Sequence, residues 1–484
     1  MMNSSDSAMV TRPDVHVGIL AYLSVAGAVI LLMMLLGLLM LLSHSGVMVL
    51  PPDLFYQVLT VHGIGMVGIA GLASSSILWF FLSRYVRLYT VILWINLALF
   101  LAGVVLILGA VFIGGFAGAW TFLYPLPAIS GGAWENGAAA VYVIGVLLVG
   151  VGFLLFFLET GRAILAEYGN FGKALGWGHL FGNAPGDPPP PTVVAATMVT
   201  VLNILAVTCG AVILVITLVN MYLPSFAINP LLAKNMIFFF GHTFINTTIY
   251  MAVIAVYEIL PLYADRPWKA NRIFLAAWNG SLLLVLMVFP HHLLMDFAMP
   301  QWLLIIGQVF SWVAGLPLLV VTVFGALTLV HRSGIKWDLA SGLLMLSMFG
   351  WASGALPAII DATVVVNSVM HNTFWVPGHF HFYLMLGMLS MVFGFLYWLR
   401  GAAAGQSDTI SWFAFWFFAL GGVGLVMTYL AAGSASVPRR FAVHLPEWVP
   451  YHSVAAVCAV IVILSVTTFV GRFLGRLRSS AGVS

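Results

Sequence analysis

Histidines are the residues of this sequence whose number and spacing most clearly offer chemistry. Of the 13 histidines, a subset falls in four apolar stretches that lie far apart along the chain. Polar side chains are costly in apolar surroundings unless they are hydrogen-bonded or functional, and imidazole is a common ligand of copper, iron and zinc. We therefore predict a metal site rather than scattered structural histidines. The subset consists of His62, His242, His291, His292, His371, His379 and His381.

The spacing of these histidines limits which of them can share a metal. His379 and His381 are two positions apart, so on a helix with about 100° per residue they point to nearly opposite faces. They are expected to bind separate centres, one on each side of their helix. The adjacent pair His291 and His292 can converge on one metal if the last turn of its helix is loosened. His242 can complete a three-imidazole site of the kind typical of copper.

One more histidine, His62, is alone in its apolar stretch. It is expected to pair with one face of the helix that carries His379 and His381. A haem with two histidine ligands, a haem with one, and a neighbouring three-histidine metal would together use six histidines.

The elements that hold these side chains are expected to be membrane helices. Charged residues make up 6% of the 484 residues and hydrophobic residues 62%, whereas a soluble domain has roughly 25% charged residues. The mean hydropathy is +1.10. This composition excludes a soluble globular protein, a disordered chain, a nucleic-acid-binding protein and a disulfide scaffold.

Apolar runs predict the number of membrane spans, because a helix needs about 20 apolar residues to cross a bilayer. The predicted fold class is an all-α integral membrane bundle of twelve transmembrane helices, and residues 1–484 are expected to form one domain with a polar tail at 1–15. The predicted spans are 17–42, 57–83, 88–115, 138–159, 194–222, 235–263, 272–292, 302–331, 341–364, 371–399, 410–433 and 451–474.

Basic residues predict the orientation of the bundle. If the N-terminus is cytoplasmic, all but three of the 17 lysines and arginines fall in cytoplasmic segments. The three others are Lys234, Arg439 and Arg440, and the arginine pair on the outer side needs a separate reason. In this orientation the seven histidines lie at similar depth in the outer half of the membrane. The polar tail is expected to be an uncleaved cytoplasmic segment of a protein of the prokaryotic cytoplasmic membrane.

Other polar features carry less chemistry. Cys209 and Cys458 lie inside spans, so no disulfide is expected. The longest break between spans, 160–193, ends in a proline-rich connector that is expected to be a spacer. The remaining histidines are expected to be interfacial or solvated; they are His16, His44, His179, His331, His444 and His452.

Five short motifs surround the candidate ligands. They are Tyr56–Gly63 (YQVLTVHG), which contains His62, Gly241-His242, His291–Asp296 (HHLLMD), His371–His381 (HNTFWVPGHFH) and Pro438-Arg439-Arg440. Their order and spacing resemble subunit I of the haem–copper oxidase superfamily, and its B-type branch most closely. The motifs extend from the second span to the eleventh, and the core of that family also has twelve spans.

The resemblance implies a role for each matching histidine. His62 and His381 correspond to the axial ligands of a low-spin haem, and His379 to the proximal ligand of a high-spin haem. The three ligands of the copper-B site correspond to His242, His291 and His292. The haem type, b or a, stays open. Copper is favoured over iron in the three-histidine site because position 246 is not a carboxylate.

The resemblance also explains the outer arginines. His371, Arg439 and Arg440 correspond to partners of the haem propionates, since carboxylates pair well with guanidinium groups. A simple interfacial arginine pair is the alternative.

One position departs from the oxidase pattern. Oxidases of the A and B types carry a tyrosine four residues after the first copper ligand, cross-linked to that histidine, which can donate an electron and a proton when the O–O bond is cleaved. The position here is Asn246, whose amide can neither be oxidised to a radical nor donate a proton at neutral pH. The sequence resembles an oxidase-like group of nitric oxide reductases in which this tyrosine is replaced.

This departure favours one reaction over another. Reduction of two NO to N2O and water needs two electrons and two protons and does not require the tyrosine, whereas four-electron reduction of O2 would lack one immediate donor. Asn246 could hydrogen-bond a bound substrate. A tyrosine from elsewhere is the alternative, but 273–282 contains none, and Tyr250 lies beyond reach of a cross-link, about 12 Å along the helix from His242 at 1.5 Å per residue.

Candidate proton-path residues lie on the sixth span. They are Thr248, Tyr250, Tyr257 and Glu258, and Glu258 is either a proton entrance or a partly solvated carboxylate at the end of a helix. The stretch 317–321, where the B-type channel has hydroxyl groups, is apolar. We expect no efficient proton pumping.

The sequence thus predicts a membrane nitric oxide reductase. The catalytic set is Asn246, His242, His291, His292 and His379, with a terminal O2 reductase of the B type as the alternative. The implied partners are a small cupredoxin-like or cytochrome c-type donor subunit on the outer side, NO or O2 as substrate, and the lipid bilayer. A transporter with structural histidines would instead predict broken helices around a substrate.

Overall fold

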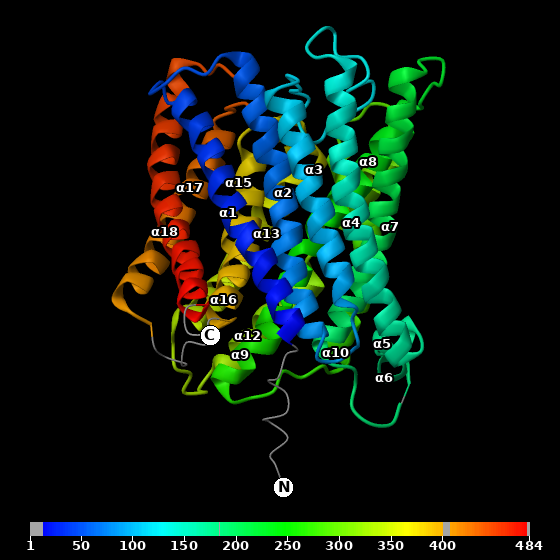
Figure 1. Ribbon diagram of the computed structural model, residues 1–484, viewed down its shortest axis with the longest axis vertical. Coiled ribbons are helices and arrows are strands. Elements are labelled where there is room, and N and C mark those ends of the chain that lie inside the picture. The colour runs from blue at the N-terminus through cyan, green and yellow to red at the C-terminus, as the bar shows by residue number, and fades with distance from the viewer. Residues whose placement is uncertain (1–12, 183, 400–406, 482–484) are drawn as a thin grey trace.

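The computed structural model describes residues 13–182, 184–399 and 407–481. Within these residues the regular elements are helices, and one isolated backbone bridge joins Thr373 to Pro438. The long helices run side by side in one bundle, as Figure 1 shows. Residues 1–12 of the predicted polar tail lie outside the described part of the chain.

The described residues contain twelve helical stretches long and apolar enough to cross a membrane, which confirms the predicted fold class. They consist of α1 (Pro13–His44), α2 (Pro52–Leu82), α3 (Thr90–Phe112), α4 (Asn136–Tyr168), α7 (Pro191–Tyr222), α8 (Pro230–Ala252) with α9 (Ile254–Ala264), α10 (Arg272–Val288) with η2 (Phe289–Leu293), α11 (Gln301–Ala314) with α12 (Leu316–Val330), α13 (Leu339–Asp361), α15 (Trp375–His381) with η3 (Phe382–Leu389) and α16 (Ser390–Leu399), α17 (Thr409–Ser434), and η4 (Pro446–Trp448) with α18 (Val449–Ala481).

Three short helices lie between the spans. The connector after the fourth span carries α5 (Phe171–Ala174) and α6 (Trp177–Phe181), and α14 (Val364–Met370) precedes the tenth span. The fourth span extends to Tyr168, so it uses part of the break predicted at 160–193.

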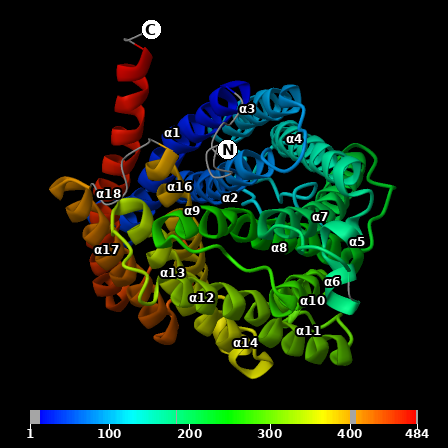
Figure 2. The same ribbon diagram turned by 90° about the horizontal axis from the view of Figure 1, so that it is seen from below.

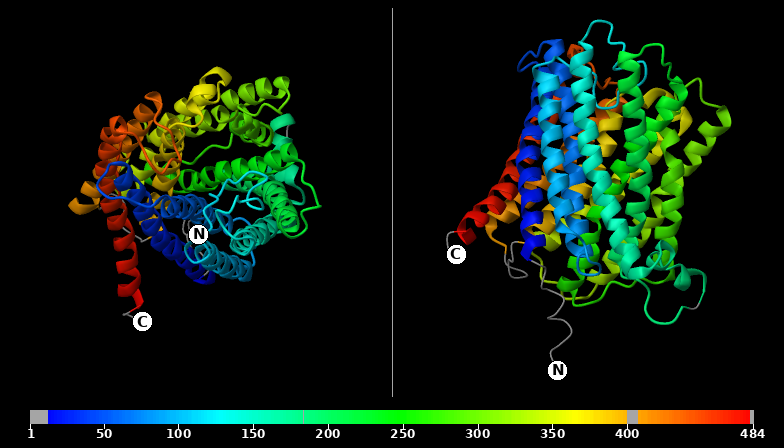
Figure 3. Two further views of the ribbon diagram at one scale, coloured as in Figure 1. Left: turned by 90° about the horizontal axis from the view of Figure 1, so that it is seen from above. Right: turned by 45° about the vertical axis from the view of Figure 1, so that its right-hand side comes forward.

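The spans that carry the candidate ligands are the most enclosed ones. In α2, in the α8–α9 stretch and in the span from α15 to α16, 72, 72 and 78% of the most apolar window is buried, whereas the value for α3 is 33%. Seen along the helix axes, α2, α8 and α9 are surrounded by other helices, and α3 and α4 lie at the rim (Figures 2 and 3). The histidines on α2, α8 and α15 therefore face protein rather than lipid.

Prolines interrupt two of the spans. Proline lacks a backbone N–H and its ring clashes with the carbonyl of residue i−4, so α10 changes at Pro290 into the 3₁₀ turn η2. In the same way α11 ends before Pro317, and α12 begins with that proline in its first turn. The break at Pro290 loosens the turn that carries His291 and His292. A loosened turn is what these two adjacent histidines need if both are to bind one metal.

Glycines allow helix backbones to approach the tenth span closely. A Cβ on Gly350 of α13 would lie 2.3 Å from the carbonyl carbon of Leu386, and a Cβ on Gly433 of α17 would lie 2.1 Å from the backbone nitrogen of Trp375. Such contacts permit only a hydrogen at these positions. They hold the tenth span, which continues after His381 as a π-helix, in one position.

The tenth span begins later than the sequence predicts. Residues 371–374 were expected inside it, but His371 caps α14 and the span starts at Trp375. The backbone of the preceding segment pairs with the loop after α17 instead: Phe374 N donates to Val437 O at 2.9 Å, and Arg439 N donates to Asn372 O at 2.9 Å. Backbone groups committed to this pairing cannot continue a helix ladder.

Candidate haem and metal site

A single large cavity brings together the predicted site residues. It has a volume of about 800 Å³ and lies at the centre of the bundle. Its lining includes all of the expected ligands, the expected propionate partners and Asn246, the position that differs from the oxidase pattern. These residues are His62, His242, His291, His292, His371, His379, His381, Asn246, Arg439 and Arg440. Residues nearly four hundred positions apart in the sequence thus meet at one place.

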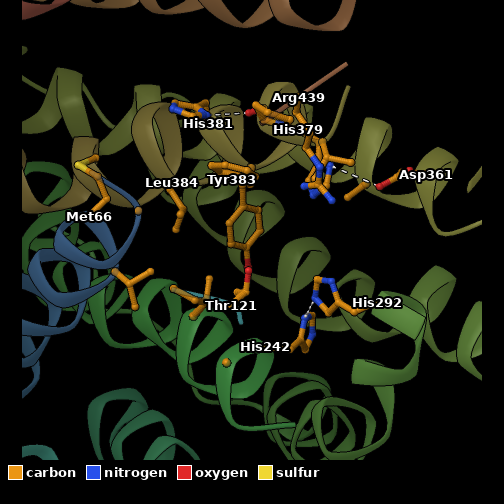
Figure 4. Close-up of a pocket in the computed structure, with 18 of the residues that line it drawn as sticks. Met66, Thr121, His242, His292, Asp361, His379, His381, Tyr383, Leu384 and Arg439 are labelled. Atoms are coloured by element: carbon orange, nitrogen blue, oxygen red, sulfur yellow. Dashed lines mark hydrogen bonds and ion pairs between the residues drawn. The ribbon is translucent and has the colours of Figure 1, made fainter. Parts of the chain in front are cut away.

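Three of these histidines form a cluster that could hold a metal ion. One nitrogen each from His242, His291 and His292 lies within 4.8 Å of the others. His242 Nδ1 lies 3.0 Å from His292 Nε2, and these two side chains face each other in Figure 4. The His291 ring contacts both, with centroids 4.5 Å from His242 and 4.3 Å from His292. A three-imidazole set suits copper, iron or zinc.

A neighbouring serine orients one ligand of this cluster. Ser311 Oγ donates to Gly307 O at 2.6 Å, so it accepts from His291 Nδ1–H at 2.8 Å. The other ring nitrogen, Nε2, is then left with a free lone pair for a metal. A hydrogen bond of this kind on the nitrogen that does not bind metal fixes the tautomer of a metal-binding histidine. On the opposite side of the cluster, Phe238 stacks on the ring of His292 with centroids 5.1 Å apart.

Two more histidines are prepared in the same way to bind a haem iron. His62 Nδ1 donates to Met33 O at 2.7 Å, and His381 Nδ1 donates to Pro377 O at 2.8 Å. A backbone carbonyl on Nδ1 leaves Nε2 as the ligand atom. Gly37 of α1 packs against the His62 ring, where a Cβ would lie 2.8 Å from Cε1. Both rings are therefore fixed in orientation before any haem is present.

His379 has a different environment from His381. Its Nδ1 is buried without a hydrogen bond in the described structure and lies 3.9 Å from Asp361 Oδ2. In Figure 4 its side chain lies toward His292 and His242, and His381 lies away from them. This agrees with two faces of the helix serving two centres. Because Nδ1 of His379 is buried beside Asp361, Nε2 is the nitrogen that would hold a haem iron.

The outer arginines have few carboxylates nearby, and Arg439 is partly buried whereas Arg440 is exposed. Burial and the adjacent Arg440 lower the pKa of Arg439 to about 9, although Asp361 acts in the opposite direction. Arg439 Nε has no hydrogen-bond partner among the described residues, and Arg440 Nη2 donates to Thr121 Oγ1 at 3.2 Å. Buried cations need anionic partners. The propionates of two haems in the cavity would supply them.

His371 shares this environment. Burial, Arg439 and Arg440 lower its pKa to about 4. The ring is therefore neutral near pH 7, where one of its nitrogens can still donate a hydrogen bond to a carboxylate. Its position outside the tenth span places it beside the arginine pair rather than on the helix face of His379.

Asn246 contacts the first histidine of the cluster from the side opposite to His292. Its Nδ2 lies 2.6 Å from His242 Nε2, whereas His242 Nδ1 faces His292. One helical turn separates the two residues on α8, which brings their side chains onto one face. The asparagine side chain thus occupies the Nε2 side of the ring and lines the cavity.

The predicted proton-path residues do not form a continuous hydrogen-bonded chain with one another in the described structure. Thr248 Oγ1 donates to Ile245 O at 2.7 Å within its own helix. Tyr257 OH lies 2.7 Å from Thr322 Oγ1, and Tyr250 lines the cavity. Thr322 was missed because the apolar stretch considered in the sequence ended one residue earlier, at position 321.

Glu258 is held in a polar cluster near the opposite end of the bundle from Arg439. It accepts hydrogen bonds from Tyr85 OH at 2.9 Å and from Thr192 Oγ1, and it forms an ion pair with Arg84 at 3.6 Å. Only 11% of its side chain is exposed. The contacts are those of an ion pair, and this burial does not fit the predicted alternative of a partly solvated carboxylate; the proton entrance stays a prediction.

Sequence analysis also missed a tyrosine that reaches into the cavity. Tyr383 follows His381 by two residues in η3 and interacts through its hydroxyl with Tyr250. Figure 4 shows its ring crossing the space between the tenth span and the region of Thr121 and His242. Its position directly after the HFH motif was the signal in the sequence.

Comparison with known proteins identifies the family of this chain. The profile of the family described as "Cytochrome C and Quinol oxidase polypeptide I" matches residues 18–461. The chain belongs to this family, subunit I of the haem–copper oxidases. The resemblance predicted from the motifs is thereby confirmed at the level of the superfamily. Membership makes the protein a multi-pass membrane oxidoreductase and implies haems and a copper or related metal site.

Individual relatives of this haem–copper oxidase subunit are distant. "Quinol oxidase subunit 1" of Sulfolobus acidocaldarius is 24% identical over 442 residues, which cover 87% of this chain and 81% of the relative. "Cytochrome c oxidase subunit 1" of Thermus thermophilus is 27% identical over 250 residues, covering 48% of this chain and 44% of the relative. The names of these relatives favour O2 reduction, the alternative above, over NO reduction.

A solved structure has the same fold. This structure of a heme-copper terminal oxidase dimer aligns with a TM-score of 0.77 and 21% sequence identity, over 96% of this chain and 84% of the other. The arrangement of the twelve spans is thus that of a haem–copper oxidase.

Proposed function

We propose that this subunit reduces nitric oxide, two NO with two electrons and two protons giving N2O and H2O. The observation that carries the proposal is the contact of 2.6 Å between the Asn246 side chain and His242 Nε2. In the A- and B-type oxidases that the sequence resembles, the cross-linked tyrosine stands at this position. The structure is consistent with that assignment, because residue 246 contacts the candidate ligand on the side away from His292.

Asparagine at this position changes which reaction the site can complete. A tyrosine there could provide an electron and a proton at once, and an amide can provide neither. NO reduction needs only the electrons of the two metal centres beside the cavity, which supply redox chemistry and substrate binding when they are occupied. We therefore favour the two-electron reaction.

The amide can still act on the substrate by hydrogen bonding. If His242 binds the metal through Nδ1, its Nε2 carries a hydrogen and must face an acceptor. The amide oxygen of Asn246 is the acceptor in that arrangement, since the protonation of the ring decides which end of an amide faces it. The amide NH2 group is then free to donate toward a substrate in the cavity. We assign this positioning role to Asn246.

The remaining predicted residues keep their roles as parts of this proposal. His62 and His381 would hold the low-spin haem and His379 the high-spin haem. His242, His291 and His292 would hold copper or iron, and His371 with Arg439 and Arg440 would bind the propionates. The Nδ1 hydrogen bonds of His62 and His381 and the buried, unpaired Nε of Arg439 support this assignment.

Two observations favour O2 reduction as a second candidate. The relatives are cytochrome c oxidases and quinol oxidases by name. In addition, Tyr383 and Tyr250 line the cavity, and a phenol can be oxidised where an amide cannot. A tyrosine outside position 246 would then have to supply the fourth electron.

The electron donor is proposed to dock at the end of the bundle that carries Arg439 and Arg440. Both arginines lie beside the cavity wall with His381, and the positive-inside bias of the sequence makes this the outer face. A cupredoxin-like or cytochrome c-type subunit at this face would deliver electrons to the haem of His62 and His381. This orientation also leaves the N-terminus in the cytoplasm.

Turnover with both gases tests the choice. The purified protein, with a reduced chemical or protein donor, should consume NO anaerobically and release N2O at a higher rate than it consumes O2 in air. N2O measured by gas chromatography should equal half of the NO consumed. Rapid O2 consumption with negligible NO turnover would overturn the proposal in favour of the second candidate.

A further inference from the structure

A second group of three histidines contains none of the predicted ligands, although His44 lines the same cavity. His44 ends α1, His444 lies in the segment between α17 and α18, and His452 lies in α18. All three were expected to be interfacial or solvated; two of them are not solvated, and His444 is half-buried. His44 and His452 are buried, with 7 and 1% of their surfaces exposed.

The ring nitrogens of this group are close enough to surround one ion. One nitrogen of each histidine lies within 4.8 Å of the other two. His444 Nδ1 lies 2.6 Å from His452 Nε2. Zinc with Zn–N bonds of roughly 2.0–2.1 Å holds tetrahedral ligands roughly 3.3 Å apart. The pair would thus have to separate by less than 1 Å.

One ring nitrogen of His44 is a buried hydrogen-bond acceptor that receives no hydrogen bond from the described residues. His44 Nε2 donates to Phe441 O at 2.9 Å, so Nδ1 of the same neutral ring is an acceptor. This Nδ1 is buried and has no hydrogen-bond partner in the described structure. A buried acceptor without a partner is costly, and a metal ion is a group that would satisfy it.

The surroundings of the group are apolar and aromatic. Phe55 lies 5.0 Å from His44, Phe374 lies 5.2 Å from His452, and Trp448 lies 5.4 Å from His444, measured between ring centroids. These rings limit access of water to the imidazoles. Imidazole is the only ligand type in the group, which suits copper and zinc rather than calcium or magnesium.

We propose that His44, His444 and His452 form a second transition-metal site, for copper or zinc, separate from the three-histidine cluster of the catalytic cavity. The rings of His44 and His444 are stacked, with centroids 3.9 Å apart and planes at 7°. Binding requires one ring to turn about χ2, a torsion that is broad in histidine. Neither the family membership nor the proposed function assigns this site.

The site would hold the segment that carries the two arginines. Ser436 and Arg440 have positive φ angles of 59 and 66°, a region that is unfavourable for residues other than glycine. His44 already bonds to Phe441 O, next to Arg440. A metal that joined His44 to His444 and His452 would clamp this segment between α1 and α18.

Metal content of the purified holoprotein tests the proposal. Cells would be grown with added copper or with added zinc, and iron, copper and zinc would be measured per polypeptide. The His444→Phe variant keeps an aromatic ring in the stack and removes the ligand atom. His331→Phe, at an exposed histidine near the opposite end of the bundle, is the matched control.

The expected result is a loss of one equivalent of copper or zinc in His444→Phe, with the haem absorption bands unchanged and with no loss in the control. Copper and zinc growth conditions, with electron paramagnetic resonance for Cu(II), identify the ion. Equal metal contents of wild type and His444→Phe would overturn the proposal.

A second measurement covers the case in which His444→Phe also loses haem. Wild type depleted with a chelator would be titrated with Zn²⁺ and with Cu²⁺, next to a His242→Ala variant treated in the same way. The His242→Ala protein should still bind one ion. Binding of none, while its low-spin haem bands are retained, would contradict a second site.

Discussion

The side chain of Asn246 contacts His242 at Nε2 and leaves Nδ1 of that ring facing His292. At the scale of single residues, this contact and the hydrogen bonds on His62, His291 and His381 define the chemistry that we propose. Each imidazole has one nitrogen occupied by protein and one left over. The identity of residue 246 then decides whether an oxidisable group stands beside the first ligand.

Substitution of Asn246 tests this argument directly. Asn246→Tyr should gain O2 reductase activity and should lose NO reductase activity by roughly tenfold, equivalent to about 1.4 kcal/mol in the barrier. The reason is that the phenol adds an electron and proton donor and removes the amide NH2. Both rates would be measured with the same reduced donor. Asn246→Gln keeps the amide and should retain the preference for NO; an unchanged ratio of rates in Asn246→Tyr would count against the electron argument.

Ser311 gives a second test at this scale. Ser311→Ala removes the acceptor of His291 Nδ1–H and should weaken metal binding in the His242, His291 and His292 cluster by roughly 10–100-fold, as losses of such partners do. Metal content after dialysis against a chelator measures this. Ser368→Ala, an exposed hydroxyl bonded within its own helix, is the control. Unaltered metal retention in Ser311→Ala would show that the cluster does not need this orientation.

At the scale of elements, breaks in the helices place the ligands. Pro290 turns the end of α10 into a 3₁₀ segment that presents two consecutive histidines to one point. Because 372–374 pair with 437–439, the tenth span cannot begin before Trp375, and Arg439 lies beside its start. Close contact of α13 and α17 with this span at Gly350 and Gly433 holds it in place.

The contact at Gly433 predicts a defect when a methyl group is added. Gly433→Ala places a Cβ 2.1 Å from Trp375 N and should destabilise the protein by about 1–3 kcal/mol, as overpacking does. Because Trp375 begins the helix of His379 and His381, occupancy of the low-spin haem should fall as well. Thermal unfolding and the haem spectrum measure the two effects. Gly109→Ala meets no atom within 4 Å, and an equal loss in that control would mean that the contact is not the cause.

At the scale of the whole molecule, burial separates a redox core from a lipid-facing shell. The three most buried spans carry His62, His242, His379 and His381. Hydroxyl groups leading from the cavity toward Glu258 make separate contacts rather than one hydrogen-bonded series. The arginine pair and His371 lie together at the other end of the cavity.

This arrangement predicts turnover without efficient proton pumping. In vesicles that contain the purified protein, turnover should consume the protons that the reaction needs. No additional protons should be released to the outside per electron transferred. The apolar stretch 317–321 and the separate contacts of Thr248 and Tyr257 are the reasons. A pH electrode outside the vesicles measures it, with an uncoupler as the control. Clear outward pumping that the uncoupler abolishes would contradict the prediction.

Local patterns in the sequence were sufficient for the twelve spans and for most of the residues that meet in the cavity. A bilayer requires about 20 apolar residues per helix, so span number follows from composition along the chain alone. Helix geometry directs His379 and His381, two residues apart, to opposite faces of their helix. It also places Asn246 one turn after His242 on the same face. Family motifs then named six candidate ligands, and all six line one cavity.

Only the tertiary structure decided which distant segments meet. His371 lies outside the tenth span because its neighbours pair with a loop more than sixty residues away, and Thr322 reaches Tyr257 from another span. The group of His44, His444 and His452 joins the first span to the last. Such contacts depend on how whole helices pack and on which backbone groups find partners across the bundle, and no local period of the sequence records that.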